Sequence, residues 1–307
     1  MLLKPEPLRR DDPVAVVAPA GAYDPDRLEQ GCRVLEGWGL RVRRPSANRT
    51  PLRYLAGSDE LRASELRDAL ADDRVKAILV ARGGFGSARL FDRLRLAPLR
   101  GTPKVFVGFS DTTVLLARLV QEAGWVSFHG PMVAADLPGL SPEAQERFRR
   151  FLFDDGPWWA GQAAECWRAG HGEGRLAGGC LSLLVSTLGT PYEFRTDHPT
   201  VLFLEDVNEK PYRVERMLVQ LRDAGKLENV TAVVIGAMPG CDDGGGSSVL
   251  ENVFRDVLAA HRFPVLFGVA AGHGTDNAVL PFGCRVSVDA DARTLELCES
   301  PFAERVR

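Results

Sequence analysis

Short apolar runs and helically spaced apolar residues alternate along the first half of the chain. Four apolar runs predict buried strands: Val14–Ala18, Leu40–Arg43, Val75–Ala81 and Lys104–Gly108. Between them, a helix is predicted to begin after Asp24, with Leu28, Cys32 and Leu35 on one face, and another after Ser58, with Leu61, Leu66 and Leu70. A further helix is expected after Gly86. Alternating units of this kind predict a parallel sheet covered by helices.

The pattern weakens over residues 135–170, where proline, glycine and polar residues are typical of a connector. Apolar strands are predicted again at Val201–Leu204, Ala232–Ile235 and Val286–Val288. We therefore expect two domains, residues 1–165 and residues 166–307. The first is predicted to be a parallel-sheet α/β domain.

Composition narrows the function classes. The 307 residues carry a net charge of −3, and lysine and arginine are spread along the chain, which argues against a nucleic-acid partner. Residues 1–12 lack the apolar stretch of a signal peptide, and no run approaches the roughly 18 apolar residues of a membrane helix. We expect a cytoplasmic protein without a membrane partner. Six widely spaced cysteines without a Cys-x-x-Cys motif predict buried thiols rather than disulfides or zinc ligands.

Ser110 stands where a short apolar strand meets a glycine turn and the start of a helix. A serine at such a junction has its hydroxyl exposed, as in a nucleophile elbow. The alternative is a serine that caps the helix, with Asp111 as a first-turn acid favoured by the helix dipole.

Glycine-rich turns follow three of the predicted strands, at Pro19–Gly21, Arg82–Gly86 and Gly108–Ser110. Ligands gather at the carboxyl ends of parallel strands. The amides of Gly83 and Gly84, with that of Asp111, are candidates for an oxyanion hole, and tight turns that need glycine are the alternative. The spacing does not match a dinucleotide fingerprint, because Arg89 stands at the third glycine position.

Two segments of the second half carry candidate partners for the serine. Glu205 ends an apolar strand, and a carboxylate there needs a partner, either an arginine such as Arg213 or a histidine. His273 lies between two glycines, which leave its ring accessible. His129, after an apolar pair, is a structural histidine, or else orients a loop or touches substrate.

Taken together, these segments resemble the LD-carboxypeptidase family of serine peptidases. The resemblance covers nearly the whole chain through seven segments in the family's order: Ala18–Gly21, Arg82–Gly86, Gly108–Thr112, His129–Pro131, Gly178–Leu184, Leu204–Arg213 and Gly272–Gly283. It implies that Ser110 is the nucleophile, that His273 is the general base and acid, and that Glu205 orients the histidine. It also implies an oxyanion hole from the Asp111 amide and a glycine amide such as that of Gly84.

The resemblance implies further properties of the whole molecule. The fold class is α/β, with a flavodoxin-like N-terminal domain carrying the serine and a β-rich α/β C-terminal domain carrying Glu205 and His273. The family uses no metal and no cofactor, and its members form homodimers. The substrate is expected to be a cytosolic muropeptide that loses its terminal D-alanine, bound by residues such as Arg82, Gly83 and His129. Arg82 or Arg89 is expected to meet the terminal carboxylate.

One residue departs from the family pattern. Cys180 stands where the family usually has asparagine, so an amide that both donates and accepts hydrogen bonds is replaced by a thiol. Specificity or rate is expected to differ if that position supports the catalytic loops.

Three other functions stay open at this point. The chain is also compatible with a peptidase that acts on aminoacyl-nucleotide conjugates, as the microcin C immunity peptidases do. An α/β-hydrolase esterase shares the order serine, acid, histidine, but the second glycine of its Gly-x-Ser-x-Gly elbow is missing here. The third alternative is a two-lobed binding protein without enzymatic activity.

Overall fold

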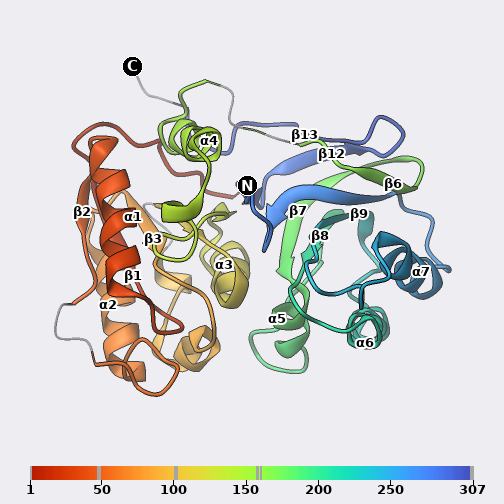
Figure 1. Ribbon diagram of the computed structural model, residues 1–307, viewed down its shortest axis with the longest axis horizontal. Coiled ribbons are helices and arrows are strands. Elements are labelled where there is room, and N and C mark those ends of the chain that lie inside the picture. The colour runs from red at the N-terminus through yellow and green to blue at the C-terminus, as the bar shows by residue number, and fades with distance from the viewer. Residues whose placement is uncertain (1, 47–49, 100–102, 157–158, 160, 305–307) are drawn as a thin grey trace. The chain divides into compact units, whose positions relative to one another are not determined.

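The computed structural model describes residues 2–46, 50–99, 103–156, 159 and 161–304 of the chain (Figure 1). It divides into two compact units. Unit 1 comprises Met1–Trp159, Ala278–Pro281 and Pro301–Arg307, and unit 2 comprises Ala160–Asn277 and Phe282–Ser300. The expected domains, residues 1–165 and 166–307, stay a prediction. Within the described residues, every helix is too short or too polar to cross a membrane.

Unit 1 is built on a six-stranded sheet of order β11-β5-β4-β3-β1-β2. Its strands are β1 (Pro13–Val17), β2 (Arg41–Arg43), β3 (Ala77–Val80), β4 (Val105–Gly108), β5 (Ser127–His129) and β11 (Leu280–Phe282). Strands β1 to β5 pair in parallel in the order 2-1-3-4-5. That order is the flavodoxin-like one, so the expected fold class is confirmed. The central strands β3 and β4 are buried along their whole length, as strands covered on both faces are.

The helical segments of unit 1 are α1 (Pro25–Gly37), α2 (Asp59–Ala71), η1 (Ser87–Arg93), η2 (Ala97–Leu99), η3 (Ser110–Thr112), α3 (Thr113–Arg118), η4 (Leu119–Ala123), η5 (Leu137–Gly139) and α4 (Pro142–Phe153). Helix α1 begins as predicted, because the Asp24 side chain accepts hydrogen bonds from the amides of Asp26 and Arg27. Ser58 caps α2 through the amide of Leu61.

Two expectations for unit 1 were wrong in detail. The helix expected after Gly86 is a seven-residue 3₁₀ helix, η1, which starts without a side-chain cap. The expected connector contains a regular helix, α4, capped by Ser141 and begun by Pro142. Helix α4 buries Phe148 and Phe151 among other apolar residues, and this packing outweighs the high polarity of its remaining positions.

Unit 2 is built on a seven-stranded sheet of order β13-β12-β7-β8-β9-β10-β6. Its strands are β6 (Glu165–Arg168), β7 (His171–Cys180), β8 (Thr200–Glu205), β9 (Val230–Ala237), β10 (Val265–Gly272), β12 (Arg285–Asp289) and β13 (Thr294–Leu297). Strands β7 to β10 are parallel, and the outer pairs are antiparallel. Helices α5 (Leu181–Ser186), α6 (Pro211–Asp223) and α7 (Ser247–Val257) pack along one another (Figure 1).

Strand β7 was not predicted, because its sequence is rich in glycine. A Cβ at Gly172 would clash with the carbonyl of Thr231, and a Cβ at Gly178 with that of Phe203. The glycines therefore let neighbouring backbone approach β7 closely. This approach places the end of β7 beside the end of β8, where Cys180 pairs with Glu205.

Two glycines of α1 give a sharp test of this packing. A Cβ at Gly31 would clash with the carbonyl oxygen of Val133, whereas a Cβ at the exposed Gly37 would meet nothing within 4 Å. We expect Gly31→Ala to destabilise the protein by about 1–3 kcal/mol through overpacking. Gly37→Ala should shift stability by less than about 1 kcal/mol, in the stabilising direction. Urea unfolding followed by circular dichroism measures both, and equal midpoints for the two variants would contradict the packing described for α1.

Candidate active site

Ser110 lies at a sharp turn between β4 and the helical segment η3–α3. The strand ends at Gly108, Phe109 is extended, and Ser110 takes a left-handed conformation with φ 59°. A left-handed L-residue costs roughly 1–2 kcal/mol. Such strain persists where the surroundings enforce it, and it is common at active sites. The conformation is that of a nucleophile elbow.

Neighbouring groups enforce the strained turn. The amide and hydroxyl of Thr112 both donate to the Phe109 carbonyl, at 3.2 and 2.8 Å. A Cβ at Gly108 would stand 2.6 Å from Thr112 Oγ1, and a Cβ at Gly83 would stand 2.9 Å from Ser110 Oγ. Glycine at position 83 therefore allows the Arg82–Gly86 loop to lie directly against the serine, and glycine at position 108 leaves room for the Thr112 side chain.

The Asp111 carboxylate ties that loop to the serine turn. It is buried, and its Oδ2 accepts a hydrogen bond from the Ser87 amide at 2.8 Å. Burial raises the pKa of Asp111, opposed by hydrogen bonds from the Ser87 and Gly86 amides. The sequence pointed to the amide of Asp111 and to a first-turn acid, but not to this side-chain role.

Arg62 is a second residue that sequence reasoning missed. Its side chain is fully buried, and its guanidinium donates to the carbonyls of Pro19, Gly57 and Gly86 and to Asp59 Oδ1. One planar group thus joins the Pro19–Gly21 turn to the Gly86 loop and to the start of α2. In the sequence Arg62 is one of several helical arginines, so no signal separates it from the exposed ones.

The remaining candidates of unit 1 differ in exposure. Arg82 is exposed and donates to the Ala22 carbonyl, and Gly84 is exposed with φ 98°. Arg89 is held by Asp59 through three hydrogen bonds of 2.7–3.1 Å. His129 is fully buried, pairs with Gly108 across the sheet and has its ring 5.4 Å from that of Phe109. These surroundings favour the structural alternative for His129.

In unit 2, the buried Glu205 pairs with His273, which is partly exposed. Glu205 ends β8 with no exposed surface, and His273 directly follows β10. Glu205 Oε2 lies 2.6 Å from His273 Nδ1 and also accepts from the His273 amide at 3.1 Å. The two arginines that were alternatives have other contacts: Arg213 pairs with Glu209, and the Arg216 guanidinium lies over the Tyr212 ring.

This pairing fixes the chemistry of the imidazole. An ionised carboxylate only accepts hydrogen bonds, so beside ionised Glu205 the proton of a neutral imidazole lies on Nδ1, and Nε2 holds the lone pair that a base uses. Burial raises the pKa of Glu205, opposed by the hydrogen bond from His273. Glu205 Oε1 accepts no hydrogen bond from the residues that the structure describes, which agrees with that direction.

The loop that carries His273 is held at both sides. Gly272 has φ 98°, and a Cβ there would stand 2.6 Å from Glu205 Oε2. Its amide donates to Asn277 Oδ1 at 2.8 Å. On the other side, Asp206 Oδ2 accepts from the Ser182 amide at 2.8 Å. Asn277 and Asp206 stand within the segments singled out in the sequence, but their bonding was not foreseen.

The structure thus brings the candidate residues together in two groups. In unit 1, Gly83 packs on Ser110 and Asp111 holds the same loop. In unit 2, Glu205 binds His273. The contacts described for each group lie within its own unit.

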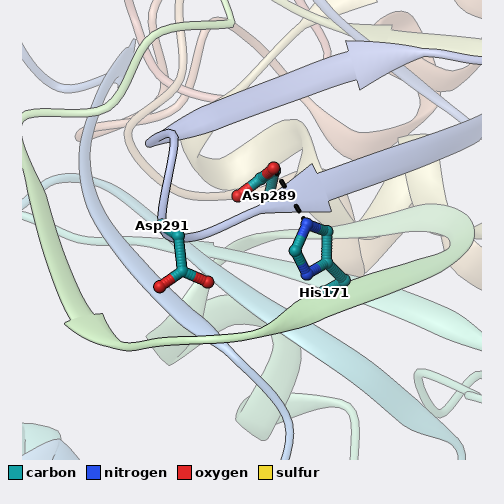
Figure 2. Close-up of side chains that lie close together, drawn as sticks. All are labelled: His171, Asp289 and Asp291. Carbon is teal, nitrogen blue, oxygen red and sulfur yellow. Dashed lines mark ion pairs between the residues drawn. The ribbon is translucent and has the colours of Figure 1, made fainter.

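A separate cluster of metal-ligating side chains lies on the sheet of unit 2 (Figure 2). One ligand atom each of His171, Asp289 and Asp291 lies within 4.8 Å of the others. His171 Nε2 is 2.9 Å from Asp289 Oδ2, and the Ala292 amide is the largest cause of the lowered pKa of Asp289. His171 begins β7, whose other end, Cys180, pairs with Glu205. At ~3.3 Å per residue the cluster is roughly 30 Å from Glu205 and takes no part in its pairing.

A strained serine elbow on a parallel sheet and a carboxylate-bound histidine are typical of hydrolases. Residues 14–130 match the family model of the LD-carboxypeptidase N-terminal domain, and residues 173–288 match that of the LD-carboxypeptidase C-terminal domain. The chain therefore belongs to the LD-carboxypeptidase family of peptidases, as the sequence predicted.

Relatives support this over almost the full length. A probable murein peptide carboxypeptidase of Bacillus subtilis (strain 168) is 35% identical over 297 residues, covering 95% of this chain and 93% of the relative. The murein tetrapeptide carboxypeptidase of Pseudomonas aeruginosa is 34% identical, covering 89% of this chain and 92% of the relative. The structure of muramoyltetrapeptide carboxypeptidase from Oxalobacter formigenes matches with a TM-score of 0.81 and 30% identity, covering 93% of this chain and 97% of that one.

The departure from the family pattern lies beside the Glu205–His273 pair. Cys180 is buried, and it is the residue of β7 that pairs with Glu205 in parallel register. Its Sγ lies 3.4 Å from Ser182 Oγ. Burial raises the pKa of the Cys180 thiol well above its usual range, so the group stays neutral.

Replacing Arg62 tests whether its guanidinium holds the loops of unit 1. We expect Arg62→Lys to destabilise the protein by about 2–4 kcal/mol, because an ammonium group leaves buried carbonyls without donors. Arg67→Lys is the matched control on the same helix, since the Arg67 side chain is 41% exposed, pairs with exposed Glu60 and donates to the Arg93 carbonyl at 3.3 Å. It should change stability by less than about 0.5 kcal/mol. Chemical denaturation measures both, and an Arg62→Lys midpoint equal to that of the control would refute this role.

Proposed function

We propose that the protein is a serine LD-carboxypeptidase that releases the C-terminal D-alanine from a muropeptide tetrapeptide. The bond cleaved is an amide between an L-configured centre and a D-amino acid. Relatives that align with this chain over almost its full length are named as carboxypeptidases of murein or muramoyl tetrapeptides. In this proposal the tetrapeptide comes from peptidoglycan recycling in the cytoplasm, and the enzyme acts as a homodimer.

The observation that carries the proposal is the 2.6 Å contact between Glu205 Oε2 and His273 Nδ1. A buried carboxylate that holds one imidazole nitrogen orients the ring and stabilises its cation. It leaves Nε2 to accept a proton from a nucleophile. The serine in a strained elbow on a glycine-lined turn, Ser110, is the nucleophile that we assign to it.

The proposed reaction proceeds through an acyl-enzyme. Ser110 Oγ attacks the scissile carbonyl while His273 Nε2 accepts the hydroxyl proton. His273 then protonates the leaving amino group, D-alanine departs, and the acyl group stays on Ser110. Water, deprotonated by His273, attacks this ester and regenerates the serine.

Backbone amides of unit 1 are assigned to the charge that develops on the carbonyl oxygen. The Asp111 amide and that of Gly84 are the proposed oxyanion donors, because the loop that bears Gly84 packs on the serine turn through Gly83. For the substrate carboxylate, exposed Arg82 is the better candidate of the two arginines. Arg89 is already held by Asp59 in an ion pair.

Serine replacement tests the nucleophile. We expect Ser110→Ala to lower kcat by several orders of magnitude while the thermal midpoint stays close to that of the parent. Mass spectrometry of L-Ala-γ-D-Glu-meso-diaminopimelyl-D-Ala after incubation measures the loss of D-alanine. Ser64→Ala, on helix α2, is the control and should retain full activity, because Ser64 Oγ donates to the Leu61 carbonyl of its own helix at 3.0 Å. Undiminished turnover by Ser110→Ala would exclude the serine mechanism.

Neutralising Glu205 tests the orienting carboxylate. We expect Glu205→Gln to lower kcat by about 10²–10⁴-fold, because an amide can present a donor to Nδ1 and select the wrong tautomer. Glu215→Gln, an exposed position on helix α6, is the control. Single-turnover kinetics on the same tetrapeptide measure both. A Glu205→Gln variant with parental kcat would show that the carboxylate plays no part in the reaction.

A further inference from the structure

Two exposed aromatic side chains contact each other in unit 1. Tyr54 is 55% exposed and Phe85 is 49% exposed. Their ring centroids are 5.7 Å apart and the planes meet at 75°, which is an edge-to-face contact. We call these two residues the aromatic pair.

The main chain beneath Tyr54 is fixed before any ligand arrives. Leu52 and Leu55 exchange two hydrogen bonds of 3.0 Å, so Arg53 and Tyr54 form the tip of a two-residue turn. Leu55 anchors the turn in the core with no exposed surface, and Arg53 has φ 58°. Rigid aromatic groups on a fixed base lose little conformational entropy on binding.

The aromatic pair stands beside the proposed nucleophile. Phe85 belongs to the loop whose Gly83 packs directly on Ser110. The turn that bears Tyr54 is tied to the same loop, because the Ala22 amide donates to the Tyr54 carbonyl at 2.9 Å and the Gly21 amide to the Gly83 carbonyl at 2.8 Å. Both aromatic side chains therefore belong to segments that are part of, or hydrogen-bonded to, the loop that lies against Ser110.

Single exposed apolar side chains are common, but two aromatic rings in contact beside a reactive serine are suited to a ligand face. The Arg53 guanidinium lies over the Tyr54 ring, with Cζ 5.7 Å from the ring centroid, and brings hydrogen-bond donors to this surface. The ligand therefore needs a broad apolar face bordered by oxygen atoms. In a muropeptide the peptide offers only small or charged side chains, whereas a sugar ring has such a face of C–H groups with hydroxyl and acyl oxygens around it.

We propose that Tyr54 and Phe85 form a subsite for the saccharide ring attached to the peptide. The inference rests on the proposed function, since the peptide at Ser110 defines where the sugar lies. The pair sets which muropeptides are preferred, and it takes no part in bond cleavage.

Two substrates separate the subsite from the catalytic machinery: N-acetylmuramoyl tetrapeptide and the free tetrapeptide. We expect Tyr54→Ala and Phe85→Ala each to raise KM for the muramoyl substrate by about tenfold, with kcat within about twofold, since one aromatic contact contributes about that factor. KM for the free tetrapeptide should stay unchanged. Tyr54→Phe keeps the ring and should behave as the parent on both substrates.

An equal rise of KM on both substrates, or none on either, would overturn the inference. Calorimetric binding of both ligands to Ser110→Ala, with and without Tyr54→Ala, gives the same comparison without turnover. If the parent protein cleaves neither substrate, the proposed function fails. Calorimetry then tests the subsite by itself: weaker binding of the muramoyl ligand alone to Tyr54→Ala supports it, and unchanged binding contradicts it.

Discussion

A carboxylate with no exposed surface is the constraint on which unit 2 depends. Removing an ion from water costs several kcal/mol in a protein, and Glu205 offsets this through two hydrogen bonds from one residue, His273. Both bonds require the His273 loop to lie directly against the end of β8. Gly272 permits that approach because any larger residue would meet the carboxylate. The position of the imidazole therefore follows from the need to pair a buried charge.

In unit 1, surrounding contacts stabilise a strained backbone conformation. The left-handed conformation of Ser110 is unfavourable by itself, and it persists because the loops around it are fixed. Buried charged side chains fix them: Arg62 binds carbonyls of two turns, and Asp111 binds amides of the Gly86 loop. In both units, a loop without regular secondary-structure hydrogen bonds is held by a buried charged side chain that hydrogen-bonds to its main chain. Each such side chain stabilises its loop, because leaving its charge buried and unpaired would cost more free energy than the backbone strain does.

The sequence predicted features that depend on local chemistry and missed those that depend on tertiary contact. Apolar runs predicted strands β1 to β4 of unit 1 but not β5, and the caps Asp24 and Ser58 predicted the starts of α1 and α2. Helix α4 was taken for a connector, because its apolar face is recognised only once packed. The candidate site residues came from turn chemistry and from the family resemblance. The bond between Glu205 and His273 spans 68 positions, and no local pattern encodes such a distance.

Cys180 shows how one side chain can act on the Glu205–His273 pair without touching the imidazole. It is the residue of β7 in register with Glu205, and a thiol is a weak hydrogen-bond donor. Glu205 Oε1 receives no hydrogen bond from the described residues, so the carboxylate depends on His273 for the bonds that the structure records. Burial consequently outweighs the imidazole in setting the direction of the Glu205 pKa, which is raised. A hydrogen-bond donor that reached the second oxygen would reduce that shift. The residue in register with Glu205 thus helps to set the pKa of the carboxylate that pairs with His273.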